Sequence, residues 1–220
     1  MKGAWIVLAA AALTLVGRSA LGQTKVEVFE VDYDNPQLAP AQWTMVLHPD
    51  GSGHFQSLGS GSPSDASDIK TPSVDRDIRV SPEFAAQLFA TAHRHKFFNM
   101  NCESHLKVAF QGWKTFTYTG PAGKGSCRFN YSKDKEIEAL GDSLVAVEST
   151  IMEGARLEIL LKHDRLGLDS EMEYLVEAAK DGRAQQICVI SGILKQLAGD
   201  PEVLDRVRER ADMLLEKAKT

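Results

Sequence analysis

The stretch WTMVLHPDGSGHFQSL, residues 43–58, predicts a β-hairpin. Two largely apolar segments, residues 43–48 and 54–58, flank the turn sequence Pro49-Asp50-Gly51-Ser52-Gly53. Proline presets φ and glycine adopts positive φ, so both residue types favour a tight turn at this place. We therefore expect an antiparallel pair of strands, with the rest of the N-terminal half forming a sheet around it.

Residues 24–131 mostly have the composition and alternation of strands. Further strands are expected at residues 25–31, near a sheet edge, and at 77–80, 105–110, 114–119 and 126–131. Residues 57–73 are rich in Ser, Gly, Pro and Asp and are expected to form a loop. One helix should begin at Ser81-Pro82-Glu83, because serine caps a helix, proline fits its first turn and glutamate favours its positive end.

From Ser132 onward, apolar residues recur every three or four positions, which predicts helices. The longest of these starts near residue 133 and is expected to end at Gly167. Three more should begin at Asp169, Ala184 and Asp200. The predicted fold class is α+β: a mostly antiparallel sheet with a packed helix, a possible βββα repeat over 42–98 and 105–155, and an all-helical C-terminal array.

Three regions follow from this division: residues 1–22, an α+β domain over 23–166, and a helical extension over 167–220. The extension has more helices than the sheet is expected to need. Self-association or a protein partner is therefore expected to use residues 168–220. The alternative is that all three helices pack on the long helix and expose only charged residues.

Residues 1–22 have the three parts of a cleavable signal peptide. Lys2 precedes the apolar run Ala4–Val16, and Ala20 and Gly22 place small residues before a cut at Gln23. This apolar run is shorter than the ~20 residues that span a bilayer. The mature protein is therefore expected to be secreted or periplasmic, with no membrane span after signal removal.

The chain carries 25 Lys and Arg against 30 Asp and Glu, a net charge of −5, and loses two cations with the signal. An acidic chain without a basic block argues against nucleic-acid binding. In an oxidising compartment, Cys102 and Cys127 are the natural disulfide pair, because both lie in polar, turn-rich surroundings. Cys188 lies among apolar residues and is expected to stay a buried thiol.

His48 and His54 flank the predicted turn, and opposed positions in a hairpin have Cβ atoms about 5 Å apart. They are the weak candidates for a metal site, which would need His93, His95 or a carboxylate as a third ligand. On a helix, His93 and His95 point in different directions, so their expected role is to face the negative helix end.

No motif identifies a catalytic residue, a metal ligand set or a cofactor site. Gly59-Ser60-Gly61-Ser62 lacks the strand and helix of a serine elbow and the Gly-Lys-Ser/Thr ending of a phosphate loop. Glutamate pairs at 136/138 and 171/173 are expected to face solvent without converging. Asn130-Tyr131-Ser132 is a lone glycosylation sequon.

The hairpin with Asp50-Gly51, the Ser81-Pro82-Glu83 helix start and Phe97-Phe98 before further strands resemble small exported bacterial domains of unknown function. The resemblance covers about residues 43–131 and implies a sheet with a helix and an exported location. It implies no activity, cofactor or site residue.

Two functional classes remain open. A non-catalytic binding or assembly module is favoured, and an extracytoplasmic hydrolase is the alternative. A hydrolase should show a pocket lined by at least two of His48, His54, His93 and His105 with a carboxylate of shifted pKa. A binding module should instead show an exposed apolar patch or groove.

We expect the exported protein to begin at Gln23. Intact-mass spectrometry and N-terminal sequencing of the exported material test this expectation. Recovery of the chain with Met1 retained, in the membrane fraction, would contradict it.

Overall fold

A computed structural model describes residues 26–58 and 72–219. The signal peptide, its cut at Gln23, the Gly59–Ser62 stretch and most of the predicted 57–73 loop lie outside the described residues. Within the described ranges, no helix is long and apolar enough to span a bilayer.

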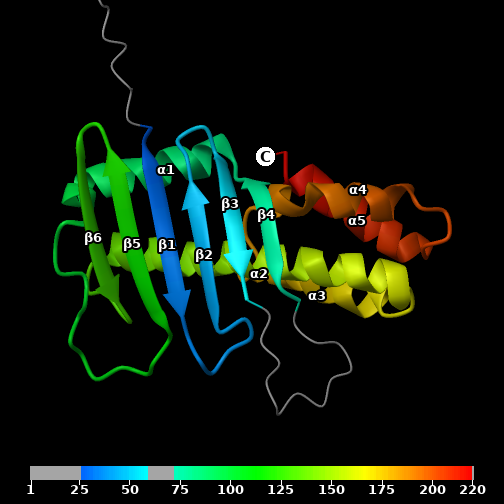
Figure 1. The fold of residues 1–220 in the computed structure, drawn as a ribbon. Helices are drawn as coiled ribbons and strands as arrows, with labels where there is room; N and C mark the ends of the chain where they lie inside the picture. Colours follow the sequence, from blue (N-terminus) through cyan, green and yellow to red (C-terminus); the bar gives the residue numbers. More distant parts are fainter. Residues whose placement is uncertain (1–25, 59–71, 220) are drawn as a thin grey trace, which may run out of the picture.

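The fold is α+β, as predicted, with all strands before the long helix (Figure 1). The strands are β1 (Val28–Asp34), β2 (Gln42–Leu47), β3 (Ser52–Ser57), β4 (Val74–Arg79), β5 (Trp113–Gly120) and β6 (Gly123–Phe129). The helices are α1 (Pro82–Arg94), α2 (Lys135–His163), α3 (Leu168–Asp181), α4 (Ser191–Gly199) and α5 (Asp205–Lys217), with short 3-10 helices η1 (Lys96–Phe98) and η2 (Ile187–Ile190).

One antiparallel sheet contains the described strands in the order β4-β3-β2-β1-β5-β6. The predicted edge position of residues 25–31 is wrong, because β1 pairs with β2 on one side and β5 on the other. Glu30 and Asp32 point to the face of the sheet that no helix covers. Their polar side chains therefore reflect an open face and not an edge strand.

The predicted strand at residues 105–110 is absent. The segment is bent instead: the Val108 amide bonds back to the Leu106 carbonyl, and Asn130 holds the Gln111 amide and the Ala109 carbonyl. It protrudes as a loop between His105 and Gly112, which both have positive φ. The second half of the possible βββα repeat therefore contains only two strands, β5 and β6, before α2.

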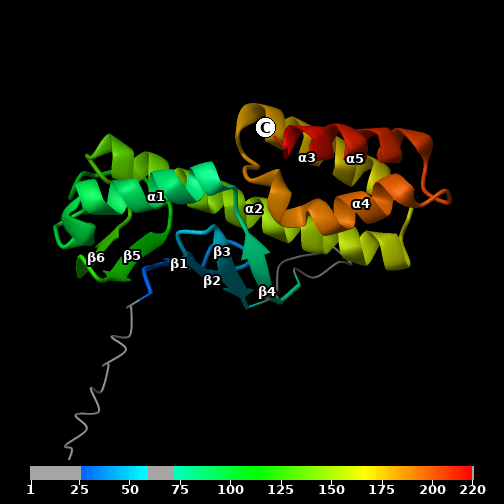
Figure 2. The ribbon, with the colours of Figure 1, turned by 90° about the horizontal axis from the view of Figure 1, so that it is seen from above.

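Helices α1 and α2 lie side by side across one face of the sheet (Figures 1 and 2). Ser81 caps α1 as predicted, because its hydroxyl accepts a hydrogen bond from the Phe84 amide. Asp134 caps α2 by accepting from the amides of Glu136 and Ile137. The sheet residues beneath the two helices are apolar, and Phe29, Phe55 and Phe116 are fully buried.

Helix α2 is longer than the sheet is wide. Its 29 residues span about 43 Å, whereas six strands measure about 24 Å across. The first part of α2, to Ala155, packs on the sheet core, and Leu157 and Leu160 join a second core with α3, α4 and α5. This division falls inside α2, before the predicted domain boundary at residue 167.

The chain between Ala184 and Ala198 is not one helix as expected. Gln186 has a φ of 53°, and the 3-10 turn η2 precedes α4, which begins only at Ser191. Ile187 and Ile190 are buried in the second core, so this break still packs its apolar residues.

The predicted disulfide between Cys102 and Cys127 is confirmed, with a Cα separation of 5.7 Å. Cys102 belongs to the loop after η1, which passes close to Cys127 of β6. Three successive residues, Lys96 to Phe98, have left-handed φ values of 54–61°. Gly125 of β6 makes room for this turn, since a Cβ there would lie 2.5 Å from the Phe97 carbonyl oxygen.

Gly154 is the point at which α2 touches η2. A Cβ on Gly154 would overlap the side chain of Ile190, whereas a Cβ on Gly192 of α4 would meet nothing within 4 Å. We expect Gly154→Ala to destabilise the fold by about 1–3 kcal/mol through overpacking. Gly192→Ala should be neutral or stabilise the fold by about 0.5–1 kcal/mol, because an unfolded chain with alanine at this position has fewer conformations to lose on folding than one with glycine.

Chemical denaturation of the two alanine variants measures this difference. Equal unfolding free energies for both variants would contradict the close contact between α2 and η2.

Candidate functional site

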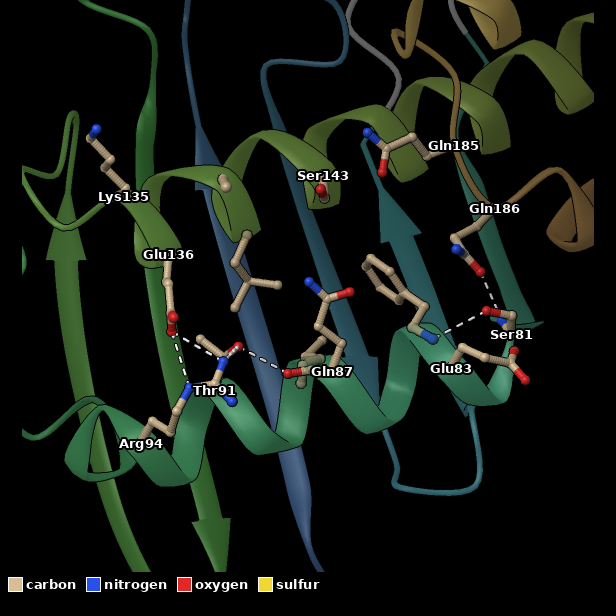
Figure 3. Close-up of a pocket in the computed structure, with 14 residues that line it drawn as sticks. Ser81, Glu83, Gln87, Thr91, Arg94, Lys135, Glu136, Ser143, Gln185 and Gln186 are labelled. Carbon is tan, nitrogen blue, oxygen red and sulfur yellow. Dashed lines mark hydrogen bonds and ion pairs between the residues drawn. The ribbon is translucent and has the colours of Figure 1, made fainter.

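A groove runs between α1 and α2 on the side of these helices that faces away from the sheet (Figure 3). Its cavity volume is about 490 Å³, which lies within the usual size of a ligand site. The segment before η2 closes one end of the groove and contributes Gln185 and Gln186.

The floor of the groove is apolar. Leu88 of α1 and Leu140 of α2 are buried, and Phe84 is half-buried beside them. The exposed methyl group of Ala139 lies at the α2 side. An apolar floor provides affinity through burial of ligand surface without fixing the orientation of the ligand.

Hydroxyl and amide groups surround this floor: Ser81, Gln87, Thr91, Ser143, Gln185 and Gln186. Several of them are held by the protein itself. The Gln186 side-chain oxygen accepts from the Ser81 amide at 2.8 Å, and the Thr91 hydroxyl donates to the Gln87 carbonyl at 2.9 Å. The Gln87 side chain projects from α1 toward α2 (Figure 3).

The other end of the groove is charged, with Arg94, Lys135 and Glu136 in its lining. Glu136 of α2 accepts hydrogen bonds from His95, at 3.0 Å, and from Arg94, at 3.1 Å. These two contacts hold the pKa of the Glu136 carboxyl below its usual range. His95 also contacts Asp134, the cap of α2, so this cluster joins the end of α1 to the start of α2.

A second cleft, of about 610 Å³, lies at the β3–β4 side of the sheet against η2. His48 and His54 both line it, together with Asp77, Arg79 and Cys188. The two histidines are not directly opposed as expected, because the turn is tighter than five residues: His54 pairs with Val46, and the His48 amide bonds to Ser52.

His54 is fully engaged by two carboxylates on β4. Its ring nitrogens lie 2.9 Å from Asp77 and 3.0 Å from Asp75. The hydrogen bond to Asp77, with the charges of both carboxylates, raises the pKa of His54. Among the described residues, no group of three His, Cys, Asp or Glu side chains is placed to hold a metal ion.

Cys188 is a free thiol, as expected, but it is half-buried and lines the second cleft instead of the core. Its neighbours Ile187 and Ile190 occupy the core in its place. Burial raises the pKa of the Cys188 thiol. Since the thiolate is the nucleophilic form, this environment disfavours a reactive cysteine.

His93 lies in the last turn of α1, as predicted, and also forms an ion pair with Glu27. It lies 2.7 Å from Glu27, which also accepts a hydrogen bond from the Tyr118 hydroxyl. Although burial acts in the opposite direction, the hydrogen bonds from Tyr118 and His93 lower the pKa of Glu27. Phe97 stacks on Tyr118 at 4.9 Å, so this cluster fastens the start of β1 to the exit of α1.

Glu171 does not face solvent as expected. Its side chain is 11% exposed and contacts Arg156 at 2.7 Å. Burial, a hydrogen bond with Glu171 and the charge of that carboxylate raise the pKa of Glu153 to about 8. No spacing in the sequence signals this pair, because the two residues lie on different helices, α2 and α3.

Asn130 of the sequon is buried, and its side chain is used by the fold. Its oxygen accepts from the Gln111 amide at 2.7 Å, and its nitrogen donates to the Ala109 carbonyl at 3.2 Å. In the folded protein this side chain anchors the loop that precedes β5.

The chain matches no known protein family, and no curated protein is significantly similar to it. The groove and the cleft are therefore interpreted from their own geometry.

The Glu153–Glu171 contact gives a test of stability against pH. The folded-state pKa of Glu153 is raised, so its contribution is greatest below the unfolded value near 4.5 and is lost as pH rises toward 8. Glu153→Gln keeps a hydrogen-bond donor at all pH values. We expect this variant to gain about 1–3 kcal/mol over the wild type between pH 5 and pH 8.

Urea unfolding at both pH values measures this gain. Glu177→Gln, at an exposed carboxylate of α3, is the control and should show no comparable change. A pH-independent difference between Glu153→Gln and the wild type would contradict the raised pKa of Glu153.

Proposed function

We propose that the protein is an exported, non-catalytic binding module that holds an extended peptide segment of a partner protein in the α1–α2 groove. The observation that carries the proposal is the groove itself, whose accessible apolar surface comes from Phe84 and Ala139, above the buried Leu88 and Leu140 and under a rim of amides and hydroxyls. Ligand sites typically combine such a floor with a few polar groups that fix orientation.

A peptide fits the chemistry of this rim. In the described chain the Gln87 side-chain amide has no hydrogen-bond partner, so it offers both a donor and an acceptor to the alternating N–H and C=O groups of an extended backbone. The Gln186 oxygen is taken by the Ser81 amide, and the Gln185 nitrogen donates to the Gly182 carbonyl.

The charged residues of the lining are two carboxylates, Glu83 and Glu136, and two cations, Arg94 and Lys135, so together they favour no strongly charged ligand. The apolar floor can receive one or two side chains of the peptide.

The hydrolase alternative has less support. The second cleft brings together His48 and His54, but Asp75 and Asp77 occupy both ring nitrogens of His54. A general base needs a free nitrogen with a pKa near the working pH. The protonated Cys188 thiol offers no activated nucleophile in the same cleft.

A partner surface on residues 168–220 stays a separate prediction. The structure removes much of the argument for it that the sequence provided. The apolar residues that suggested it are buried in the second core: Ile187, Ile190, Ile193, Leu194 and Leu197. These helices cover the overhanging part of α2, which accounts for their presence. Exposed apolar side chains in this region are dispersed, as at Tyr174 and Met213.

The secreted or periplasmic location is part of the proposal. It is supported by the signal-peptide pattern of residues 1–22 and by the Cys102–Cys127 disulfide, a bond that persists in oxidising compartments.

Selection of a phage-displayed library of random 12-residue peptides on the mature protein tests the groove. We expect selected peptides to bind the wild type and to lose at least about tenfold in affinity for Ala139→Trp, which fills the groove. Ala86→Trp is the matched control, an exposed alanine of α1 that does not line the groove.

Calorimetric titration of the three proteins with the selected peptides gives the affinities, and circular dichroism checks that both variants fold. Failure to enrich any peptide, or equal binding by the two tryptophan variants, would refute the peptide-binding function.

A further inference from the structure

The two ends of the α1–α2 groove carry opposite charges that the fold leaves unpaired. Glu83, in the first turn of α1, and Lys135, the first residue of α2, are exposed and lie at opposite ends of the groove (Figure 3). Within the described chain, neither side chain has an ion pair or a hydrogen-bond partner. Both are therefore available to a ligand in the groove.

The other charged residues of the lining do not cancel this polarity. Glu136 accepts a hydrogen bond from Arg94, so these two side chains neutralise each other. Asp134 caps α2 and does not line the groove. One positive charge, on Lys135, then remains at this end of the lining, and one negative charge, on Glu83, remains at the other. The groove suits a ligand that is neutral overall but has opposite charges at its two ends.

The distance between the two ends fits a short extended segment. Because Glu136 contacts Arg94, the start of α2 lies level with the end of α1. The eleven positions from Glu83 to Arg94 measure about 16 Å along α1. An extended chain covers this length in about five residues.

The two unpaired charges also lie on opposite walls of the groove. Glu83 belongs to α1, and Lys135 belongs to α2. In an extended chain, residues an odd number of positions apart point to opposite sides. A separation of five positions therefore directs one charged side chain to each wall, whereas a separation of four would direct both to the same wall.

We propose that the groove selects peptides in which a basic residue contacts Glu83 and an acidic residue, five positions away, contacts Lys135. This selectivity rests on the proposed peptide-binding function. Ala139 lies one helical turn, about 6 Å, beyond Lys135 on the same wall. The peptide residue two positions from the acidic one, toward the basic one, therefore contacts Ala139 and is expected to be apolar.

The peptides selected from the 12-residue library test the spacing directly. We expect pairs of a basic and an acidic residue at a separation of five positions to be enriched over the unselected library. Pairs separated by four or six positions should not be enriched, because they place both charges on one wall. Sequencing of the selected pool measures this enrichment and gives the order of the two residues along the peptide.

Exchange of the two groove charges tests which side chains recognise the peptide. The probes are one selected peptide and a synthetic version in which its basic and acidic residues are exchanged. Exposed ion pairs are weak, and the positive end of α1 offsets part of the charge of Glu83. We therefore expect the wild type to prefer the selected peptide by about three- to tenfold. The variant Glu83→Lys/Lys135→Glu should prefer the exchanged peptide by a similar factor.

The matched control is Lys195→Glu/Glu209→Lys, which makes the same substitutions at exposed residues of α4 and α5 outside the groove. It should keep the wild-type preference. Glu83→Gln and Lys135→Gln each remove one charge without reversing it and should each reduce the preference. Calorimetric titration gives the affinities, and circular dichroism checks that every variant folds.

Two results would overturn the inference, and they differ in what they leave standing. Peptides that bind the wild type and lose affinity for Ala139→Trp, but show no five-position spacing and no change of preference in the charge-altered variants, would refute the charge selectivity alone. The peptide-binding function would then stand. Failure of the library to yield any peptide that binds in the groove would refute both.

Discussion

The mismatch between the length of α2 and the width of the sheet determines the rest of the architecture. About 20 Å of an amphipathic helix extends past β4, and its apolar residues Leu157 and Leu160 must be covered. Helices α3, α4 and α5 provide that cover, and Gly154 allows η2 to approach α2 closely. The C-terminal helices are therefore required by the fold, whether or not they also bind a partner.

The groove follows from the way in which α1 and α2 are tied at both ends. At one end, Glu136 joins Arg94 and His95. At the other, Gln186 holds the Ser81 amide of α1, and its neighbour Gln185 bonds to Ala146 and Thr150 of α2. Between these ties the two helices are bridged by no side-chain hydrogen bond within the described chain. The groove stays open there between Phe84 and Ala139, and hydrogen bonds hold part of its rim in place. Such preorganisation lowers the entropic cost of the binding that we propose.

Local chemistry made part of this structure predictable. The Pro49–Gly53 turn, the Ser81 cap and the Cys102–Cys127 pair each depend on residue types with strong local preferences. The strand expected at 105–110 is lost because Asn130, distant in the sequence, holds this segment as a loop. The central position of β1 depends on its pairing with both β2 and β5. No local pattern encodes either feature. The groove was not predicted, because Gln87 and Gln186 come to line one hollow only where the segment before η2 meets the start of α1.

Two buried ionisable side chains, Lys114 and Glu153, lie where α2 packs on its neighbours. Lys114 lies under Gly141 of α2, bonds to the Asn130 carbonyl, and has a pKa lowered by burial. Glu153 is likewise enclosed at the α2–α3 contact. Such groups often mark catalytic sites, but neither one lines the groove or the His48–His54 cleft. They therefore constrain the position of α2 and lie away from both hollows.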